Sequence, residues 1–514
     1  MVPRKSTPEK MIALRFLKVF LILVTLNSWG IADVEDRPNF VIIMADDMGF
    51  SELGCYGSEI KTPAIDKLAS EGVRFSQFYN SNRCGPSRAS LMTGCYPWRV
   101  GQPPGANTFA NLDKNSVTLM ELLKEAGYET CGVGRLDMVT SENWHSPSNS
   151  AKVLDWSFGV MSGGPGDYFK KAAKSPWVKN GKKWERPEGE YSTDLITDFV
   201  SEFIKSTANR SKPFCLYISH FAPHWPLQAH EETVRPYLDL YKAKPIQSLM
   251  QERLEKQIQL GLIPPGTQIP ESSLTAKPAA KGYLALERLA INAAMIESID
   301  KSVAKTIEAL EAAGKLDNTL ILVLSDNGAS DHMHHDHGKQ VPEGVRPGST
   351  HSFINQGPSV AALGNIPFRN YKATDYEGGI ASPLIARWPA GISSPGRISN
   401  HIAHISDILP TCLELAGISH STKFQEREVI AYTGSSLVPA LNDKQQTTER
   451  ILAFATAIRD GDWKLIIRED GEHELYDLSK DRNESINLAG EYPEIVQKMN
   501  KRHKELFTKT NNQK

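Results

Sequence analysis

The sequence lacks an excess of charge of either sign, because its 58 lysine and arginine residues nearly balance its 60 aspartate and glutamate residues. A chain without strong net charge has no general field that attracts nucleic acid or an anionic membrane. We therefore expect no nucleic-acid partner, and a charged substrate must be bound by a local cluster of side chains. At 514 residues, the chain is long enough for more than one domain.

Long hydrophobic runs are also absent. The apolar run at residues 19–26 is much shorter than the roughly 20 residues needed to cross a bilayer. Basic residues precede it and the small residues Gly30-Ile31-Ala32 follow it, which is typical of a secretory signal peptide; an uncleaved anchor is the alternative. We expect residues 1–32 to be a signal peptide, and the mature protein to be exported, periplasmic or secreted, and soluble without a stable membrane span.

Cysteine is scarce, and its six residues are scattered through the chain. They do not have the spacing of a zinc site, either among themselves or with histidine. A chain of this length can build its own core, so export permits disulfides but size does not require them. The six residues are Cys55, Cys84, Cys95, Cys131, Cys215 and Cys412.

The chain does contain an alternation of strand-like and helix-like segments. Residues 39–45 are a short, apolar, β-branched run, typical of a strand buried on both faces. Residues 62–72 have a capping threonine, a first-turn proline and a terminal glycine, which indicate a helix. This alternation predicts an α/β fold with a large doubly wound sheet, mixed but mostly parallel, flanked by helices. Further strands are expected at residues 73–79, 128–133, 213–219, 318–324 and 383–389, and further helices at residues 117–126, 283–313 and 404–416.

Other segments have a different pattern. Residues 141–192 are rich in Ser, Gly, Pro, Asn and Lys with little periodicity, so we expect loops there that line the substrate cleft. Residues 236–282 are a polar insertion that contains proline. Near the end of the chain, residues 457–465 and 474–478 have the pattern of hairpin strands, and residues 496–507 that of a final helix.

Polar side chains directly follow two of the predicted strands. Asp46 and Asp47 come after the first apolar strand, and Asp326 and Asn327 come after a later one. Ligands bind at the carboxyl ends of strands in open α/β sheets, and adjacent carboxylates repel each other unless a cation lies between them. All four side chains offer oxygen, which favours calcium, with magnesium as the alternative, over zinc. Solvated loop aspartates are the other interpretation.

A cysteine stands at the start of the segment 84–94, Cys-Gly-Pro-Ser-Arg-Ala-Ser-Leu-Met-Thr-Gly. Pro86 suits the first turn of a helix, where a missing N–H costs nothing. Ser87 and Arg88 fall where the backbone N–H groups of a helix start favour an anion. The segment therefore brings a thiol, an arginine and a helix start together. From the local pattern alone, a buried cysteine in front of a capped helix is the other interpretation.

The pattern Cys-x-Pro-Ser-Arg followed by Leu-x-Thr-Gly resembles the signature of the type I sulfatases, arylsulfatase-like enzymes of the alkaline phosphatase superfamily. Other segments similar to this family occur in order from residue 38 to near residue 495. The resemblance implies a sulfuric ester hydrolase in which a maturation enzyme oxidises Cys84 to formylglycine, whose hydrate is the nucleophile. It also implies a catalytic domain at residues 33–420 and a small antiparallel C-terminal subdomain at residues 421–514.

Two later segments resemble the same family. His224 lies in Ala-Pro-His-Trp-Pro-Leu, and Lys372 begins Lys-x-x-x-x-Glu-Gly-Gly. The resemblance implies that Arg88 holds the hydrate and the sulfate, and that His224 and Lys372 contact the ester oxygen, one of them protonating the leaving alcohol. It further implies that the cation polarises a sulfate oxygen. Packing against Trp225 is the alternative for His224, and His220 is expected to be structural.

The sequence departs from the family pattern at Gly-Arg-Leu-Asp, where sulfatases usually have Gly-Lys-x-His. Arg135 and Asp137 occupy the places of the lysine and the histidine. Arg135 can clamp an oxyanion at two points, and Asp137 can accept a proton, although its charge repels a sulfated intermediate. The two side chains can instead pair with each other and leave the site, and His145 can act from the neighbouring loop. These options stay open at the level of sequence.

The richest histidine cluster, at residues 331–337, has the sequence Asp-His-Met-His-His-Asp-His. Histidines at such spacing can bind zinc. However, the Gly, Pro and Ser residues that follow favour a mobile loop, and the resemblance assigns the cluster no role in the reaction.

Three functional hypotheses follow. The first, which we take as the prediction, is an active, cation-dependent sulfatase acting on a sulfated small molecule or a sulfated carbohydrate. The second is a phosphodiester or phosphonate hydrolase on the same fold, because phosphoryl and sulfuryl groups share their geometry. The third is a weakly active or non-catalytic binder of sulfated glycans, because Arg135 and Asp137 replace the family residues.

Overall fold

The computed structural model describes residues 37–511 apart from residues 104–109, 144, 162, 165, 171–175, 277–282, 333–340, 420–421 and 444–449. The predicted signal peptide at residues 1–32 therefore lies outside the described residues. Within the described ranges, the helices are too short or too polar to cross a membrane.

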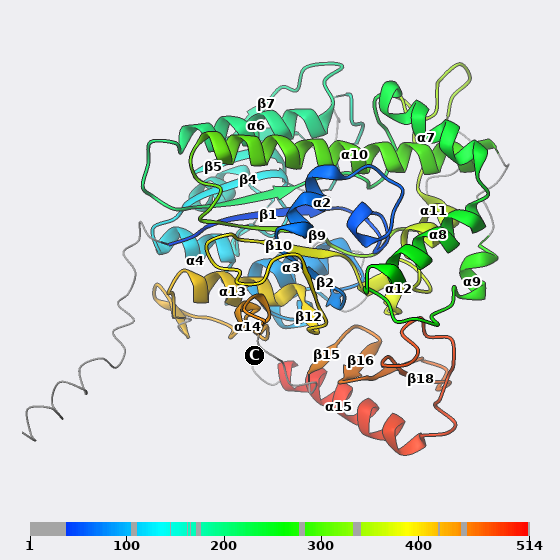
Figure 1. The fold of residues 1–514 in the computed structure, drawn as a ribbon. Coiled ribbons are helices and arrows are strands. Elements are labelled where there is room, and N and C mark those ends of the chain that lie inside the picture. The colour runs from blue at the N-terminus through cyan, green and yellow to red at the C-terminus, as the bar shows by residue number, and fades with distance from the viewer. Residues whose placement is uncertain are drawn as a thin grey trace, which may run out of the picture.

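A single ten-stranded sheet organises most of the chain (Figure 1). Its five central strands, β9, β1, β8, β4 and β5, run parallel to one another. β10 is antiparallel to both its neighbours, and β6 and β7 add antiparallel strands at the far edge. In spatial order the strands are β11 (Arg397–Ser399), β2 (Val73–Phe75), β10 (Leu384–Arg387), β9 (Thr319–Ser325), β1 (Asn39–Ala45), β8 (Phe214–Ser219), β4 (Glu129–Arg135), β5 (Trp156–Val160), β6 (Trp177–Lys179) and β7 (Lys182–Trp184).

Helices cover both faces of this sheet, which confirms the predicted doubly wound α/β fold. Figure 1 shows α6 and α10 across one face, and α3, α4 and α13 across the other. The helices are α2 (Pro63–Ser70), α3 (Cys84–Thr93), α4 (Leu119–Glu125), α5 (Pro147–Val153), α6 (Ser192–Ser206), α7 (Glu231–Ala243), α8 (Ile246–Gln259), α9 (Glu271–Leu274), α10 (Tyr283–Ala312), α11 (Gly357–Gly364), α12 (Glu377–Ile380), α13 (Ile408–Leu415), α14 (Val438–Leu441) and α15 (Pro493–Asn511), with short 3₁₀ turns η3 (Gly54–Tyr56), η4 (Pro97–Val100) and η5 (Ile405–Asp407).

The central strand β1 explains how the two layers are held. Its side chains alternate between two separate apolar cores: Val41 and Ile43 belong to the core under α6 and α10. Phe40, Ile42 and Met44 belong to the core under α3, α4 and α13. Successive side chains of a strand point to opposite faces, so an unbroken apolar run is what a strand covered on both sides requires.

The prediction of loops throughout residues 141–192 is wrong. This segment contains α5, β5, β6, β7 and the start of α6. β5 pairs in parallel with β4, and Phe158 on β5 stacks on Phe199 of α6 with ring centroids 4.9 Å apart. The parallel partner strand precedes the segment and Phe199 follows it. A short strand that is stabilised by such distant partners has little recognisable pattern in its own sequence.

Two further predictions need correction in their detail. The predicted strand at residues 73–79 is broken into β2 and the short β3 (Phe78–Tyr79). The predicted helix at residues 404–416 begins only at Ile408, because His404 ends the short strand β12 (Ala403–His404) and the turn η5 intervenes. The polar insertion at residues 236–282 consists mainly of the end of α7 together with α8 and α9.

The last part of the described chain is the C-terminal unit, which we define as β15–β18 and α15. The four strands form an antiparallel sheet that includes both predicted hairpin strands, and α15 includes the predicted final helix. Figure 1 shows this unit beside the end of the main body that carries α12. The strands are β15 (Ile451–Ala453), β16 (Ala457–Asp460), β17 (Trp463–Ile466) and β18 (Glu474–Asp477); a separate short hairpin is formed by β13 (Lys423–Phe424) and β14 (Arg427–Glu428).

Buried charges join the C-terminal unit to the main body. Glu377, at the start of α12, lies 3.0 Å from Lys464 of β17 and accepts a hydrogen bond from Tyr79 at 2.8 Å. Lys464 also lies 2.7 Å from Glu484, and both side chains are fully buried. We call this group the junction cluster; its members are Glu377, Lys464, Glu484, Arg459 and Arg482.

Candidate active site

The ends of β1 and β9 bring the predicted oxygen ligands together. The last residues of the two strands are register partners, so the residues that follow each strand leave the sheet at the same edge. The Asp47 N–H donates to Asp326 Oδ1 at 3.2 Å, and Asn327 Nδ2 donates to Asp47 Oδ1 at 2.7 Å. Asp46, Asp47, Asp326 and Asn327 are all buried.

Cys84 begins α3 at this same edge of the sheet. Its Sγ lies 3.3 Å from Asp46 Oδ1 and 3.9 Å from Asp47 Oδ1. Lys372 Nζ lies 3.0 Å from the same sulfur. Burial, and then the negative charge of Asp46, raise the pKa of the Cys84 thiol well above its ordinary value, so the thiol stays protonated at neutral pH.

Arg88, one turn further along α3, is completely buried among the carboxylates. One guanidinium nitrogen lies 3.2 Å from Asp46 and 2.8 Å from Asp326. The other donates to the Tyr217 hydroxyl at 3.1 Å and to Ser219. Because every one of these partners is buried, the arginine is fixed in a single orientation.

Arg135 and Asp137, at the end of β4 and in the turn after it, both stay at this site. Arg135 Nε donates to Asp137 Oδ2 at 2.6 Å, and its NH1 donates to Asp46 Oδ2 at 2.5 Å. The pair therefore forms, but it does not leave the carboxylate cluster. Four buried carboxylates face three buried cations, which leaves one net negative charge; the group comprises Asp46, Asp47, Asp137, Asp326, Arg88, Arg135 and Lys372.

In this crowded group of carboxylates, the pKa values of Asp46 and Asp326 shift in opposite directions. Burial, followed by the charge of Asp46, raises the pKa of Asp326 above its ordinary value. Burial would also raise the pKa of Asp46, but Arg135 and the other cations hold it below its ordinary value. A cation bound between such carboxylates relieves their repulsion.

One buried atom is suited to complete a set of ligands. Among the described residues, Asn327 Oδ1 has no hydrogen-bond partner although it is buried. A buried acceptor without a partner costs free energy unless a ligand or a water occupies the position in front of it. Together with the carboxylates of Asp46, Asp47 and Asp326, this oxygen makes an all-oxygen donor set of the kind that hard divalent cations prefer.

His224 lies on the more open side of the cluster. Its side chain is 25% exposed, and Nε2 is 3.9 Å from Asp47 Oδ2. Nδ1 is 2.8 Å from the carbonyl oxygen of Trp225, which orients the ring. One ligand atom each from Asp46, Asp47, Cys84 and His224 lies within 4.8 Å of the others.

Comparison with known proteins identifies the family. Residues 38–418 match the family model described as Sulfatase. This chain belongs to the sulfatase family. Residues 370–510 match a second model, described as N-sulphoglucosamine sulphohydrolase, C-terminal. The fold and the family together make the protein a sulfuric ester hydrolase, as the resemblance predicted.

Relatives of this sulfatase match over most of their length. An uncharacterized sulfatase of Schizosaccharomyces pombe is 31% identical over 528 residues, covering 90% of this chain and 92% of the relative. The arylsulfatase of Klebsiella aerogenes is 28% identical over 438 residues, covering 78% of this chain and 92% of the relative.

Solved structures share the fold of this sulfatase. The crystal structure of Ps i-CgsB in complex with k-i-k-neocarrahexaose has a TM-score of 0.66 and 24% identity, covering 92% of this chain and 93% of the other. The structure of BT4656 in complex with its substrate D-glucosamine-2-N,6-O-disulfate has a TM-score of 0.61 and 21% identity, covering 93% of this chain and 98% of the other.

The other histidines singled out from the sequence are not assembled around the sulfatase cluster. His145 is exposed in the turn before α5, unlike the buried groups around Cys84. His220 is fully buried at the end of β8, and burial lowers its pKa to about 4, so it is neutral at physiological pH. His332 is half-buried beside Asp331, and the rest of that histidine cluster lies outside the described residues.

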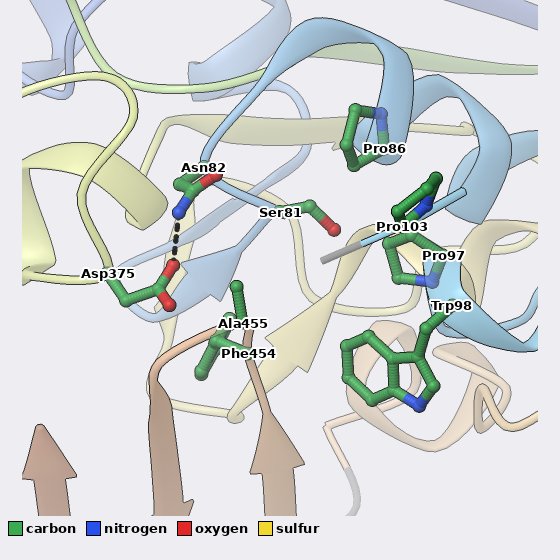
Figure 2. Close-up of a pocket in the computed structure, with 9 residues that line it drawn as sticks. All are labelled: Ser81, Asn82, Pro86, Pro97, Trp98, Pro103, Asp375, Phe454 and Ala455. Carbon is green, nitrogen blue, oxygen red and sulfur yellow. Dashed lines mark hydrogen bonds between the residues drawn. The ribbon is translucent and has the colours of Figure 1, made fainter. Parts of the chain in front are cut away.

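Sequence reasoning missed the residues that hold the main groups in place. Tyr217 and Ser219 on β8 fix Arg88, although the strand was recognised only as an apolar run. The signal was available, because polar groups at alternate positions near the end of a buried strand share one face. Asp375 was also missed; it is buried three residues after Lys372, and Figure 2 shows its carboxylate facing Asn82.

Proposed function

We propose that this sulfatase removes sulfate from sulfated carbohydrates, using a formylglycine made from Cys84 and a bound divalent cation. The observation that carries the proposal is the convergence on one sulfur: Asp46, Asp47 and Lys372 all lie within 4 Å of Cys84 Sγ. An unmodified thiol with a raised pKa is a poor nucleophile, which supports oxidation by a maturation enzyme. The hydrate of the resulting aldehyde supplies a hydroxyl group that can attack sulfur.

The proposed cation is held by Asp46, Asp47, Asp326 and Asn327. The all-oxygen donor set and the unpartnered Asn327 Oδ1 support calcium, with magnesium as the alternative. Once bound, such an ion polarises a sulfate oxygen and acidifies a neighbouring hydroxyl group. A divalent ion also changes the net charge of the cluster from one negative to one positive, which suits an anionic sulfate ester.

Side chains of this protein are proposed to stabilise charge and to donate the proton that the reaction needs. Arg88, fixed by β8, presents positive charge to both the nucleophile and the sulfate. Lys372 contacts the sulfur, and His224 lies close by on the more open side, where the alcohol must leave, so one of them protonates the ester oxygen. Burial opposes the charge of Lys372, but Asp47 and its neighbours raise its pKa, so Lys372 stays a cation.

Arg135 and Asp137 are proposed to share the roles of the lysine and histidine usual in the family. Asp137 Oδ1 is buried and has no hydrogen-bond partner within the described part of the chain. It is therefore available to accept the proton that the sulfated intermediate must lose before sulfate departs. Arg135 bridges Asp137 and Asp46, so its charge offsets the repulsion between the carboxylate and the sulfate group.

The substrate class and the location are part of the same proposal. Two proteins of the same fold bind carbohydrates, k-i-k-neocarrahexaose and D-glucosamine-2-N,6-O-disulfate, which supports a sulfated carbohydrate as substrate here. The basic and apolar pattern of residues 1–32 supports export. We also propose residues 33–420 as the catalytic domain and residues 421–514 as the C-terminal subdomain.

Mass spectrometry and kinetics test the proposal together. The protein is produced in a host with a formylglycine-generating enzyme, and the peptide containing residue 84 is weighed. We expect the aldehyde in place of the thiol, together with hydrolysis of an aryl sulfate and of sulfated saccharides. Cys84→Ala should abolish turnover, whereas the control Cys95→Ala, a buried cysteine just beyond the end of the same helix, should retain it.

Other outcomes would contradict the proposal. An unmodified Cys84 and no turnover in such a host would mean that the formylglycine route is wrong. Faster hydrolysis of matched phosphate esters than of sulfate esters would favour the phosphodiester or phosphonate hydrolase instead.

A further inference from the structure

Asp375 connects three parts of the chain through one buried carboxylate. Oδ1 accepts a hydrogen bond from Asn82 Nδ2 at 2.5 Å. Oδ2 accepts two hydrogen bonds from Thr456, one from its backbone N–H at 2.5 Å and one from its hydroxyl at 2.9 Å. Figure 2 shows Asn82 and Asp375 facing each other at one side of a pocket, with Phe454 and Ala455 of the C-terminal unit beside them. Only 3% of Asp375 is exposed.

The partners of Asp375 flank the reacting groups. Asn82 lies two residues before Cys84, and Asp375 lies three residues after Lys372. A second hydrogen bond joins the same two segments, because the Ala373 N–H donates to the carbonyl oxygen of Asn82 at 2.8 Å. Two hydrogen bonds therefore join the segment that carries Lys372 to the segment that carries the sulfur, and Lys372 Nζ lies 3.0 Å from that sulfur.

The C-terminal unit holds the Lys372 segment from its other side. Thr456 lies in the turn between β15 and β16, and it bonds only the outer oxygen of Asp375. Two residues further along, the Glu377 N–H donates to Glu484 Oε2 at 2.8 Å. The backbone after Lys372 is thus tied at successive points to residues that lie far beyond it in the sequence.

We propose that Asp375 is a positioning residue that fixes Lys372 against residue 84, and that the C-terminal unit takes part in sulfate-ester hydrolysis through Thr456. This inference rests on the proposed function. A long lysine side chain reaches a reacting atom reproducibly only when its backbone is fixed, and small displacements at such a site reduce turnover strongly. The C-terminal unit therefore contributes to the rate although its own side chains do not touch the sulfur.

Replacing the carboxylate with an amide tests the clamp with little change of shape. In Asp375→Asn, an amide NH₂ must face either the Asn82 amide or the Thr456 donors, so one contact becomes donor against donor. We expect kcat to fall about 100-fold while KM stays within about threefold of wild type. The exchanged pair N82D/D375N restores a donor and an acceptor to each contact, and it should recover at least about tenfold of the lost kcat.

Two variants separate positioning from general stability. Thr456→Val removes the hydroxyl hydrogen bond but keeps the backbone one, so kcat should fall by only a few-fold. Asp407→Asn is the matched control: its buried carboxylate also ties the main body to the start of the C-terminal unit, by accepting hydrogen bonds from Arg450, just before β15, at 2.5 and 2.7 Å. This control should lower the melting temperature and leave kcat of the folded enzyme near wild type.

Hydrogen exchange gives a readout that does not depend on turnover. In Asp375→Asn, peptides covering residues 80–84 and 370–376 should exchange at least about tenfold faster, while peptides from β1 are unchanged. If wild-type protein fails to hydrolyse sulfate esters, the proposed function is wrong, and this measurement still decides whether Asp375 holds the two segments. The inference is overturned if Asp375→Asn leaves exchange and kcat at wild-type values, if N82D/D375N recovers nothing, or if Asp407→Asn loses as much kcat.

Discussion

The site around Cys84 and the junction cluster are both groups of buried charged side chains, but they differ in the balance between carboxylates and cations. At the junction, three cations surround two carboxylates, and Lys464 is within 3.0 Å of both Glu377 and Glu484. At the site, four carboxylates face three cations, and two buried oxygens, Asn327 Oδ1 and Asp137 Oδ1, have no partner among the described residues.

The comparison shows which features distinguish a functional site from a structural cluster of buried charges. Burial and ion pairing are common to both groups, so neither of them marks chemistry. An excess of carboxylates and a partly exposed histidine distinguish the group around Cys84 from the junction cluster. The excess negative charge at the site favours a bound cation, as proposed, whereas the carboxylates of the junction cluster are already paired with buried cations.

Of the experiments that distinguish the site from the junction cluster, removing divalent ions should have the largest effect on activity. A chelator should lower kcat/KM on the order of 10³-fold, because the ion that polarises the sulfate and offsets the excess negative charge of the carboxylates is then missing. Added calcium should restore activity and raise the melting temperature, since a ligand that binds only the folded state stabilises it. Asp326→Asn should weaken this calcium response, whereas Glu484→Gln should keep it. A full calcium response in Asp326→Asn would contradict the assignment of the ligands.

Breaking the junction should affect stability more than chemistry. Lys464→Met leaves Glu377 and Glu484 buried without their shared cation, and we expect a loss of about 3–5 kcal/mol in the free energy of unfolding. Urea denaturation measures it. Lys480→Met is the control, because Lys480 pairs with Asp477 at the surface and its loss should leave the urea midpoint unchanged. If both variants lowered the free energy of unfolding equally, the buried ion pairs of Lys464 would contribute no more to stability than the surface pair of Lys480.

Single and double substitutions test whether Asp137 is the proton acceptor. Asp137→Asn should lower kcat about 10²-fold, because the amide cannot take up a proton. The pair R135K/D137H supplies a lysine and a histidine instead, and it should return kcat to within about tenfold of wild type. Steady-state kinetics on an aryl sulfate measure both. Wild-type activity in Asp137→Asn would show that the proton goes elsewhere.

His220 adds a third kind of buried polar group, one without a charge to balance. Its pKa is lowered by burial from 6.5 to about 4, so between those values the unfolded chain binds a proton that the folded protein does not. Stability is therefore present above pH 6.5 and is lost as the pH falls toward 4, by roughly 2 kcal/mol at pH 5. His220→Leu should show a shallower loss of stability between pH 7 and 5 in urea titrations.

A control with the opposite sign is available for this last experiment. His230 Nε2 donates to Asp194 Oδ2 at 2.9 Å, and this hydrogen bond to a carboxylate raises the pKa of His230 above its ordinary value. Its contribution to stability is present at low pH and is lost as the pH rises. His230→Leu should therefore steepen the acid loss, and the same change of slope in both variants would contradict the linkage argument.

How much could be predicted from the sequence depended on where the partners of each residue lie. The carboxylates after β1 and β9 were predicted because each follows an unmistakable apolar strand, and parallel neighbours end at one edge. The state of Arg135 was open, because its two acceptors come from different strands and only the fold brings them together. β5 was missed because it is short, and because its parallel partner β4 and the helix α6 that carries Phe199 lie almost entirely outside the segment.

The hydrogen bonds of Asp375 to Asn82 and Thr456 also could not be predicted from the sequence. Its contacts join residues 293 and 81 positions apart in the chain. A spacing rule describes neighbours on one helix or strand, and it gives no information about a carboxylate that bridges two turns and a separate sheet.

The pairing of β1 with β9 carries a consequence for insertions and deletions. Seven successive residues of each strand are matched one to one, and the acidic residues of the site directly follow the last residue of each strand. Shortening either strand by a single residue would reverse which face each following side chain meets. Even if the two apolar cores re-formed around such a slip, the acidic groups would then point away from residue 84, leaving a folded sulfatase without an active site.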